Sequence, residues 1–437
     1  MSVRQTVGIY TLGCKVNQYE SQAIAERCEA LGILVLPPEE ICDAYIINTC
    51  TVTGEADRKA RQYIRRAISQ NPEAKIIVTG CFSQLNPRTV AEIPGVDYIC
   101  GNTNKLAAAE VAAELLRASQ KNQNPEISVS DIKAAGFEPM QIKSFGRTRA
   151  FLKIEDGCES NCAYCIIPAA RGKIRSKPLA EVVSEVKTLI GAGCHEVVLT
   201  GIETAAYGRD LGTDLSSLLE EIDNIEGIGR VRLGSLDPAL LRPRFIERIS
   251  KLRSLAPHFH ISIQSGCDRV LALMRRKYNT GMARRALADL RAAFPGVQFT
   301  ADMIVGFPGE TDTDFADTLD FVRWAKFLSI HVFPYSRRPG TAAAQIPEQV
   351  PADIKKQRWD ELDRLQSTIR RGILDDIVAN SPVQEVLFEN PEEKEAFGHT
   401  ASFIGVSVPG PLTDGRPLRH VKLERHDGLI CFGSLAD

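Results

Sequence analysis

Six apolar runs recur between residues 149 and 333 at the spacing of strands that alternate with helices. The runs are Arg149 to Glu155, Glu196 to Gly201, Arg230 to Ser235, Phe259 to Gln264, Gln298 to Val305 and Ser329 to Phe333. The helical stretches between them include Leu179 to Ile190, Ala239 to Leu252, Met282 to Ala293 and Asp314 to Phe327. Repeated strand–helix units build a parallel sheet. Since six units are too few to close an eight-stranded barrel, we expect an open (β/α)6 partial TIM barrel whose chemistry gathers at the carboxyl ends of its strands.

One of these strand-end loops carries Cys158, Cys162 and Cys165 in the spacing C-x3-C-x2-C. Thiolates are the preferred protein ligands of iron-sulfur clusters, and a closed site takes four of them. Three local cysteines therefore predict a cluster with one iron open to an exchangeable ligand. The alternative, a structural zinc site, needs a fourth local ligand, and the nearest histidine along the chain, His195, belongs to no motif.

The N-terminal part predicts a second set of three cysteines. From Val7 to about Arg117, short apolar runs alternate with helical stretches, as in a parallel α/β domain. Three of the runs lead directly to Cys14, Cys50 and Cys81. Ligands bind at the carboxyl edge of such sheets, so the three thiols are expected to converge. The alternative is three buried structural cysteines. Spacing leaves open whether Cys100, after a fourth run, is also a ligand.

The rest of the chain completes a division into three domains. A length of 437 residues exceeds one ordinary core. Residues 118–143 are polar without a sustained period and predict a linker. After a charged helix from about Ala352 to Ala379, four short runs predict a small β-barrel that holds more acid than base. These runs are Val383 to Phe388, Thr400 to Val408, Arg419 to Glu424 and Leu429 to Phe432. We expect domains at 1–117, 144–375 and 376–437.

Composition indicates a globular protein outside the membrane. Hydrophobic residues make up 44% and charged residues 25%, with a net charge of −2. No secretory signal and no apolar run long enough to span a bilayer is found, so we expect a cytoplasmic protein with reduced thiols and no membrane partner. Basic residues cluster in five runs, which either form a basic face or lie on solvated helices. The runs are Arg58 to Arg66, Arg171 to Lys177, Arg242 to Arg253, Arg275 to Lys277 and Arg364 to Arg371.

Six motifs together resemble the radical S-adenosylmethionine (SAM) methylthiotransferases. They are Thr11-Leu12-Gly13-Cys14-Lys15-Val16-Asn17, Asn48-Thr49-Cys50, Thr79-Gly80-Cys81, the C-x3-C-x2-C loop, His260-Ile261-Ser262-Ile263-Gln264-Ser265-Gly266-Cys267 and Ala301-Asp302-Met303-Ile304-Val305-Gly306-Phe307-Pro308-Gly309-Glu310. The first and fifth motifs resemble the branch that methylthiolates N6-threonylcarbamoyladenosine in tRNA. The alternatives within the family are isopentenyladenosine in tRNA and a ribosomal-protein side chain.

The resemblance implies a set of cofactors and partners. It assigns an auxiliary [4Fe-4S] cluster to Cys14, Cys50 and Cys81, and the radical [4Fe-4S] cluster to Cys158, Cys162 and Cys165. It further implies SAM, the anticodon stem-loop of a tRNA, an electron donor such as flavodoxin or ferredoxin, and a C-terminal RNA-binding TRAM barrel. A different class, a cluster scaffold or electron carrier without turnover, would produce no 5'-deoxyadenosine on reduction.

Strand-end positions suggest how the chain contacts these ligands. We expect Tyr164 and the backbone near Ile166 at the adenine of SAM, Glu203 at its amino group, and Ser235 and Gln264 at its other polar atoms. A second hypothesis places RNA phosphates on four basic residues that follow the cysteine loop, namely Arg171, Lys173, Arg175 and Lys177. Cys267 is expected to line the cavity that the two clusters share. Four other cysteines, Cys28, Cys42, Cys194 and Cys431, are expected to be core or surface residues. The sequence assigns no catalytic acid or base.

Overall fold

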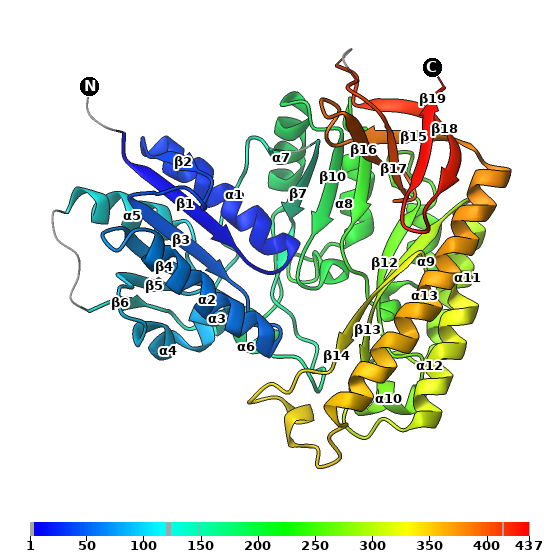
Figure 1. The fold of residues 1–437 in the computed structure, drawn as a ribbon, viewed down its shortest axis with the longest axis horizontal. Helices are drawn as coiled ribbons and strands as arrows, with labels where there is room; N and C mark the ends of the chain where they lie inside the picture. Colours follow the sequence, from blue (N-terminus) through cyan, green and yellow to red (C-terminus); the bar gives the residue numbers. More distant parts are fainter. Residues whose placement is uncertain (1–3, 119–123, 147, 413–414, 437) are drawn as a thin grey trace.

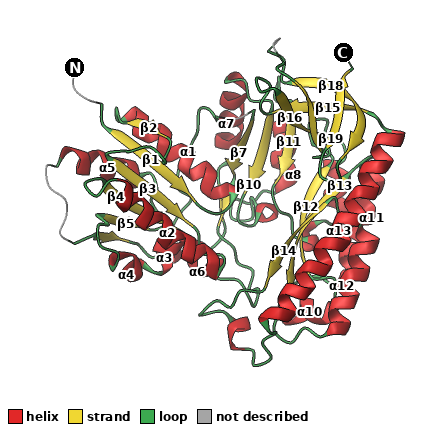
Figure 2. Cartoon of the chain, viewed as in Figure 1, coloured by secondary structure: helices red, strands yellow, loops and turns green. Residues whose placement is uncertain are grey.

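The chain forms three parts, which Figure 1 colours from blue to red along the sequence. The computed structural model describes residues 4–118, 124–146, 148–412 and 415–436. A blue N-terminal sheet lies beside a green and yellow sheet, and a red barrel packs at one end of the latter. Figure 2 shows helices on both faces of the N-terminal sheet and on the outer side of the central one. None of the helices in the described ranges is long and apolar enough to cross a membrane.

The N-terminal part is a parallel sheet of order β2-β1-β3-β4-β5-β6. Its strands are β1 (Thr6–Thr11), β2 (Leu34–Leu36), β3 (Ala44–Thr49), β4 (Lys75–Gly80), β5 (Tyr98–Cys100) and β6 (Glu126–Ser128). Helices α1 (Lys15–Ala30) and α5 (Ala107–Arg117) cover one face, and α2 (Gly54–Gln70), α3 (Cys81–Leu85) and α4 (Pro87–Ala91) the other. This confirms the predicted α/β class, although β6 adds an edge strand from within the segment predicted as a linker. Residues 119–123 of that segment lie outside the described residues.

Helix α1 belongs to two cores at once. Ile24 and Cys28 pack against the N-terminal sheet, whereas Tyr19 and Ala23 belong to the core of the central sheet. The Tyr19 hydroxyl also lies 2.9 Å from Glu185 of α7 (Leu179–Gly191). The N-terminal part is therefore anchored to the central part through buried contacts.

The central part is an open sheet of parallel strands, as predicted. Its strands are β7 (Arg149–Lys153), β10 (Glu196–Thr200), β11 (Arg230–Leu233), β12 (His258–Gln264), β13 (Gln298–Val305) and β14 (Ser329–Pro334). Two three-stranded sheets, β7-β10-β11 and β12-β13-β14, meet through isolated parallel bridges. The other elements are β8 (Glu155–Asp156), β9 (Arg175–Ser176), α6 (Ile167–Arg171), α8 (Leu215–Asp223), α9 (Pro243–Ile249), α10 (Asp268–Leu273), α11 (Thr280–Ala293) and α12 (Asp312–Ala325).

The C-terminal part follows a long helix, α13 (Ala352–Asn380). Five strands close into a barrel of order β15-β16-β17-β19-β18. They are β15 (Val383–Phe388), β16 (Glu395–Thr400), β17 (Gly405–Pro409), β18 (Leu418–His426) and β19 (Cys431–Leu435). The predicted small β-barrel is thus confirmed.

Two predicted elements are wrong in detail. The expected helix from Ala239 to Leu252 is a short 3-10 turn followed by α9, because Pro243 holds Arg242 in an extended conformation and starts a new helix. The expected strand from Thr400 to Val408 begins instead with a turn, in which Phe403 has φ +71°. The apolar Phe403 and Ile404 made this turn look like strand.

Candidate functional site

A cavity of about 570 Å³ lies between the N-terminal sheet and the mouth of the partial barrel. Cys14, Cys50 and Cys81 line it from the carboxyl ends of β1, β3 and β4. Facing them, Thr200 and Ser235 line it from the barrel strands. The fold thus brings the three predicted N-terminal cysteines together at one cavity that the barrel shares. Cys100 is buried at the end of β5 and does not line this cavity.

Glycine lets two of these cysteines approach each other. Gly13, directly before Cys14, has φ +101°, a conformation that residues with a Cβ rarely adopt. A Cβ at Gly13 would lie 2.7 Å from Cβ and 2.9 Å from Sγ of Cys50. Any side chain at position 13 would therefore push the Cys14 and Cys50 loops apart.

Arg171 contacts Cys81 and is fully buried. Its Nε donates to the Cys81 sulfur at 3.2 Å, and its Nη1 lies 2.6 Å from Glu20 and 3.2 Å from Asp156. Lys105 and Lys153 also pair with Glu20, and Lys153 and Arg175 pair with Asp156. Two carboxylates thus meet four cations in this network. The surplus of positive charge lies next to the Cys81 sulfur.

The second trio lies on the loop that follows β8. The Cys158 thiol donates to Glu203 at 3.1 Å, and the Ser160 N–H donates to the Cys158 sulfur at 3.4 Å. Arg276 donates from Nη1 to the Cys162 sulfur at 3.1 Å. The Cys165 N–H closes a turn on the Cys162 carbonyl at 3.0 Å. Arg276, which the sequence analysis placed only in a basic run, therefore contacts a predicted cluster ligand.

Both trios are chemically suited to iron-sulfur clusters. All twelve cysteines are free thiols, and those of the second trio are half-buried. Burial raises the pKa of the Cys50 thiol to about 12 and that of the Cys165 thiol to about 11. These thiols stay protonated at neutral pH unless a metal displaces the proton, as ligation by thiolate requires. The guanidinium groups of Arg171 and Arg276 contact sulfur and would compensate the negative charge of such ligands.

Of the residues expected to contact SAM, two lie on the cysteine loop or at its end, and three lie at or just after the ends of β10, β11 and β12. Tyr164 lies edge-on to Phe307, with ring centroids 6.5 Å apart, and Ile166 caps α6. Glu203 contacts Cys158, as described above. Ser235 lies on the wall of the 570 Å³ cavity, and Gln264 ends β12 with φ +61°. Cys267, which was expected to line the cavity, is instead buried and does not line it, and its thiol donates to Asp314 at 3.2 Å.

The hypothesis of phosphate contacts at the basic run after the cysteine loop is wrong for three of its four residues. Arg171 and Lys177 are fully buried and Arg175 is 7% exposed, whereas only Lys173 is exposed. Lys177 pairs with the buried Glu185, and the other two pair with Asp156. These cations hold elements together and cannot reach a phosphate.

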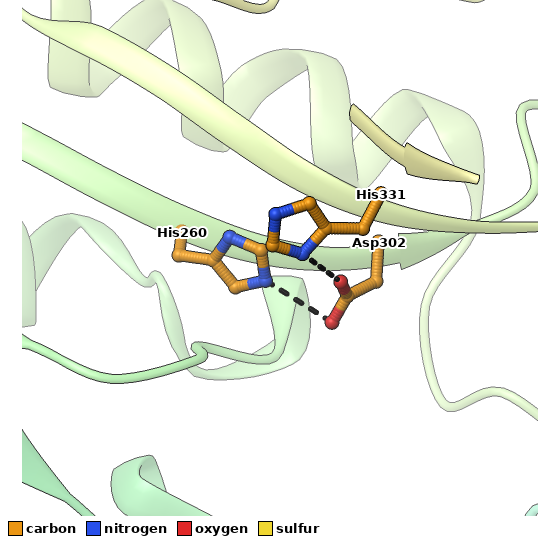
Figure 3. A group of neighbouring side chains, drawn as sticks. All are labelled: His260, Asp302 and His331. Carbon is orange, nitrogen blue, oxygen red and sulfur yellow. Dashed lines mark ion pairs between the residues drawn. The ribbon is translucent and has the colours of Figure 1, made fainter. Parts of the chain in front are cut away.

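A polar cluster that the sequence analysis missed lies on the inner side of β12, β13 and β14. Asp302 accepts from His260 Nε2 at 3.0 Å and from His331 Nδ1 at 3.3 Å, as Figure 3 shows. Although burial opposes ionisation, these two hydrogen bonds hold the pKa of Asp302 well below its usual range. All three side chains line the 570 Å³ cavity. His260 and Asp302 belong to two of the motifs named above, and Asp302 pairs in register with His331 inside β13 and β14.

Comparison with curated proteins shows close relatives over nearly the whole chain. The chain is 40% identical to the threonylcarbamoyladenosine tRNA methylthiotransferase MtaB of Bacillus subtilis, over 93% of this chain and 90% of that protein. It is 37% identical to the MtaB protein of Rickettsia prowazekii, over 93% and 92%. It is 33% identical to the tRNA-2-methylthio-N(6)-dimethylallyladenosine synthase of Moorella thermoacetica, over the full length of both.

Family profiles agree with this relationship, and a solved structure shares the fold. Residues 152–322 match the Radical SAM superfamily, and residues 6–101 match the uncharacterized protein family UPF0004. The fold is similar to that of the radical SAM methyltransferase TsrM of Kitasatospora setae, with a TM-score of 0.57 at 14% identity, over 78% of this chain and 74% of that one. With three cysteines at the loop of a partial barrel and relatives of this identity over full length, the chain belongs to the radical SAM methylthiotransferase family.

Proposed function

We propose that the protein converts N6-threonylcarbamoyladenosine at position 37 of tRNA to its 2-methylthio derivative. The substrate named for the MtaB relatives supports this choice, because identity to them reaches 40%, against 33–34% for the dimethylallyladenosine synthases. The observation that carries the proposal is the cavity in which Cys14, Cys50 and Cys81 face the barrel mouth. A base placed there would contact the N-terminal cysteines on one side and the ends of the barrel strands on the other.

The two trios would hold two clusters with separate tasks. Cys158, Cys162 and Cys165 would bind the radical [4Fe-4S] cluster, and Cys14, Cys50 and Cys81 an auxiliary one. When bound, these groups and SAM would supply a radical that removes the hydrogen from C2 of the adenosine, and the methylthio group that replaces this hydrogen. Residues 1–117, 144–375 and 376–437 would act as the methylthiotransferase, radical SAM and RNA-binding units, with an electron donor such as flavodoxin or ferredoxin.

The chain's own residues position and shield these groups. Arg171 and Arg276 offset the charge on the sulfurs that they contact. Tyr164, Ile166, Glu203, Ser235 and Gln264 would hold SAM, with Glu203 at its amino group. Asp302 stays ionised and orients two imidazoles at the cavity wall, where they would contact the substrate.

Two single substitutions test this division of labour in the anaerobically reconstituted protein. Cys81→Ala is expected to abolish 2-methylthio product while reductive cleavage of SAM to 5'-deoxyadenosine continues. Cys158→Ala is expected to abolish both, and Cys100→Ala, as the matched control, to keep both. Loss of SAM cleavage in Cys81→Ala would contradict the proposal.

The substrate is tested separately by mass spectrometry of tRNA nucleosides from a strain that lacks the gene. Loss of 2-methylthio-N6-threonylcarbamoyladenosine supports the proposal. Loss of the isopentenyladenosine derivative, or of a modified ribosomal-protein side chain, would assign the alternative substrates instead.

A further inference from the structure

A second pocket, of about 370 Å³, lies toward the amino ends of the strands of the partial barrel, away from the strand-end cysteines. Residues of β7, β11, β12 and β14 line it, and the C-terminal barrel closes it with Phe397 and Phe403. Lys15, His260 and His331 line both this pocket and the 570 Å³ cavity. The two spaces therefore adjoin, and a ligand in the cavity can extend into the pocket.

The side chains around this pocket are basic. Eight of its lining residues are lysine, arginine or histidine, namely Lys15, Arg149, Arg232, Arg370, His258, His260, His331 and His399. Among the described residues, no aspartate or glutamate lines it. A concave site with this composition favours an anion.

Most of these cations already have partners. Arg232 makes two hydrogen bonds to Glu196, at 2.9 and 3.0 Å, and Arg149 lies 3.4 Å from Glu389. Arg370 donates to the Gly428 carbonyl at 2.7 Å. Lys15 differs, because within the described part of the chain its ammonium has no hydrogen bond or ion pair and lies 5.9 Å from the centre of the Phe151 ring. Lys15 is exposed to solvent, so the pocket offers one cation without a polar partner among the described residues.

A buried imidazole adds a second unsatisfied group. His258 is 4% exposed, and its Nε2 lies 3.1 Å from the Thr300 hydroxyl. Its Nδ1 is buried without a partner among the described residues. A buried polar atom without a partner destabilises a fold unless a ligand or water satisfies it.

We infer that this pocket receives the N6 side group of the substrate, with the carboxylate of that group paired with Lys15. The inference rests on the proposed function, because a threonylcarbamoyl group carries a carboxylate and a hydroxyl. The hydroxyl would satisfy His258 Nδ1. An isopentenyl group has neither function and would bury the Lys15 charge unpaired, which is unfavourable. The pocket therefore selects the acidic side group over an apolar one.

The test compares two synthetic anticodon stem-loops that differ only at this carboxylate. One carries N6-threonylcarbamoyladenosine, and the other carries the same group as its primary amide. Binding is measured by fluorescence titration with the full-length reconstituted protein, so that the readout does not depend on turnover. Since hydrogen bonds to charged groups are the stronger ones, wild type is expected to bind the acid about 10- to 100-fold more tightly than the amide.

Lys15→Met is expected to reduce this acid-over-amide ratio to about one, and Lys15→Arg to retain much of it because the charge remains. Lys187→Met, which changes an exposed lysine on the outer helix α7, serves as the control and is expected to keep the wild-type ratio. Iron and sulfide content is measured in each variant, because Lys15 follows Cys14.

Two results would overturn the inference: a wild-type ratio near one, or an unchanged ratio in Lys15→Met. Failure of the proposed function is seen separately. In that case the wild type forms no 2-methylthio product from the acid stem-loop, whatever its binding ratio.

Discussion

Replacement of Arg171 by methionine should weaken the junction between the N-terminal and central parts. The guanidinium is fully buried and contacts Glu20 of α1, Asp156 of β8, the Asn17 amide oxygen at 2.6 Å and the Cys81 sulfur. Methionine fills similar space but removes the charge and every donor. Because these partners come from both parts of the chain, the loss falls on their interface.

The loss in the free energy of unfolding depends on which ion pairs Glu20 and Asp156 keep after the substitution. Removal of one partner from a buried ion pair costs about 3–5 kcal/mol. Glu20 keeps Lys105 and Lys153, and Asp156 keeps Lys153 and Arg175, so the charge contribution belongs at the low end, about 3 kcal/mol. The lost hydrogen bond to Asn17 adds about 1 kcal/mol. We expect the free energy of unfolding to fall by about 4 kcal/mol.

Urea denaturation of the cluster-free protein measures this loss without a contribution from iron. Arg171→Lys is expected to give an intermediate value, because it keeps the charge but loses the planar fork. The control is Arg323→Met on α12, an exposed arginine paired with Asp320, whose loss is expected to cost about 0.5 kcal/mol or less. If Arg171→Met unfolds within about 1 kcal/mol of wild type, the network does not hold the two parts together.

Three further outcomes are expected. Gly13→Ala should displace Cys50 and lower iron content while SAM cleavage continues, and a full iron complement would contradict this reasoning. Burial, and then the nearby Arg232 charge, hold the pKa of His258 well below its ordinary value, so the unfolded state binds the proton more readily. The free energy of unfolding should therefore fall as pH drops below about 6.5, by up to about 1.4 kcal/mol per pH unit, and His258→Gln should flatten this slope in urea titrations. Phe403→Ala removes a ring stacked on His258 and His399 at 4.7 and 4.6 Å and should lower the free energy of unfolding by about 2–3 kcal/mol, whereas Phe403→Leu should cost less.

The positions of the strand-end cysteines were predictable because strand ends are local features. Apolar runs that stop at a glycine or a polar residue mark where each strand ends, and parallel strands place those ends at one edge. Cys14, Cys50 and Cys81 therefore met as expected. The same reasoning predicted that the C-x3-C-x2-C loop lies at the barrel mouth.

The roles of the basic residues were not predictable, because burial of a charge depends on partners distant in the sequence. Arg171 pairs with Glu20, and Arg230 reaches Glu385 of the C-terminal barrel at 2.7 Å. A run of arginine and lysine therefore looks the same on a solvated surface and in a buried network. The pocket around Lys15 escaped prediction for the same reason, since its wall combines all three parts of the chain.

Contacts at both edges of the open sheet place the N-terminal cysteines over its mouth. At the β7 edge the Arg171 network joins the N-terminal part to the cysteine loop. At the β14 edge Arg338 lies 2.7 Å from Asp57 and donates to the Thr51 hydroxyl at 2.8 Å, next to Cys50. An open sheet alone leaves its mouth accessible from the side, but these two anchors hold the N-terminal sheet across it. The position of Cys14, Cys50 and Cys81 across from the barrel strands is thus a property of the protein fold, which can hold these thiols in place before any cofactor binds.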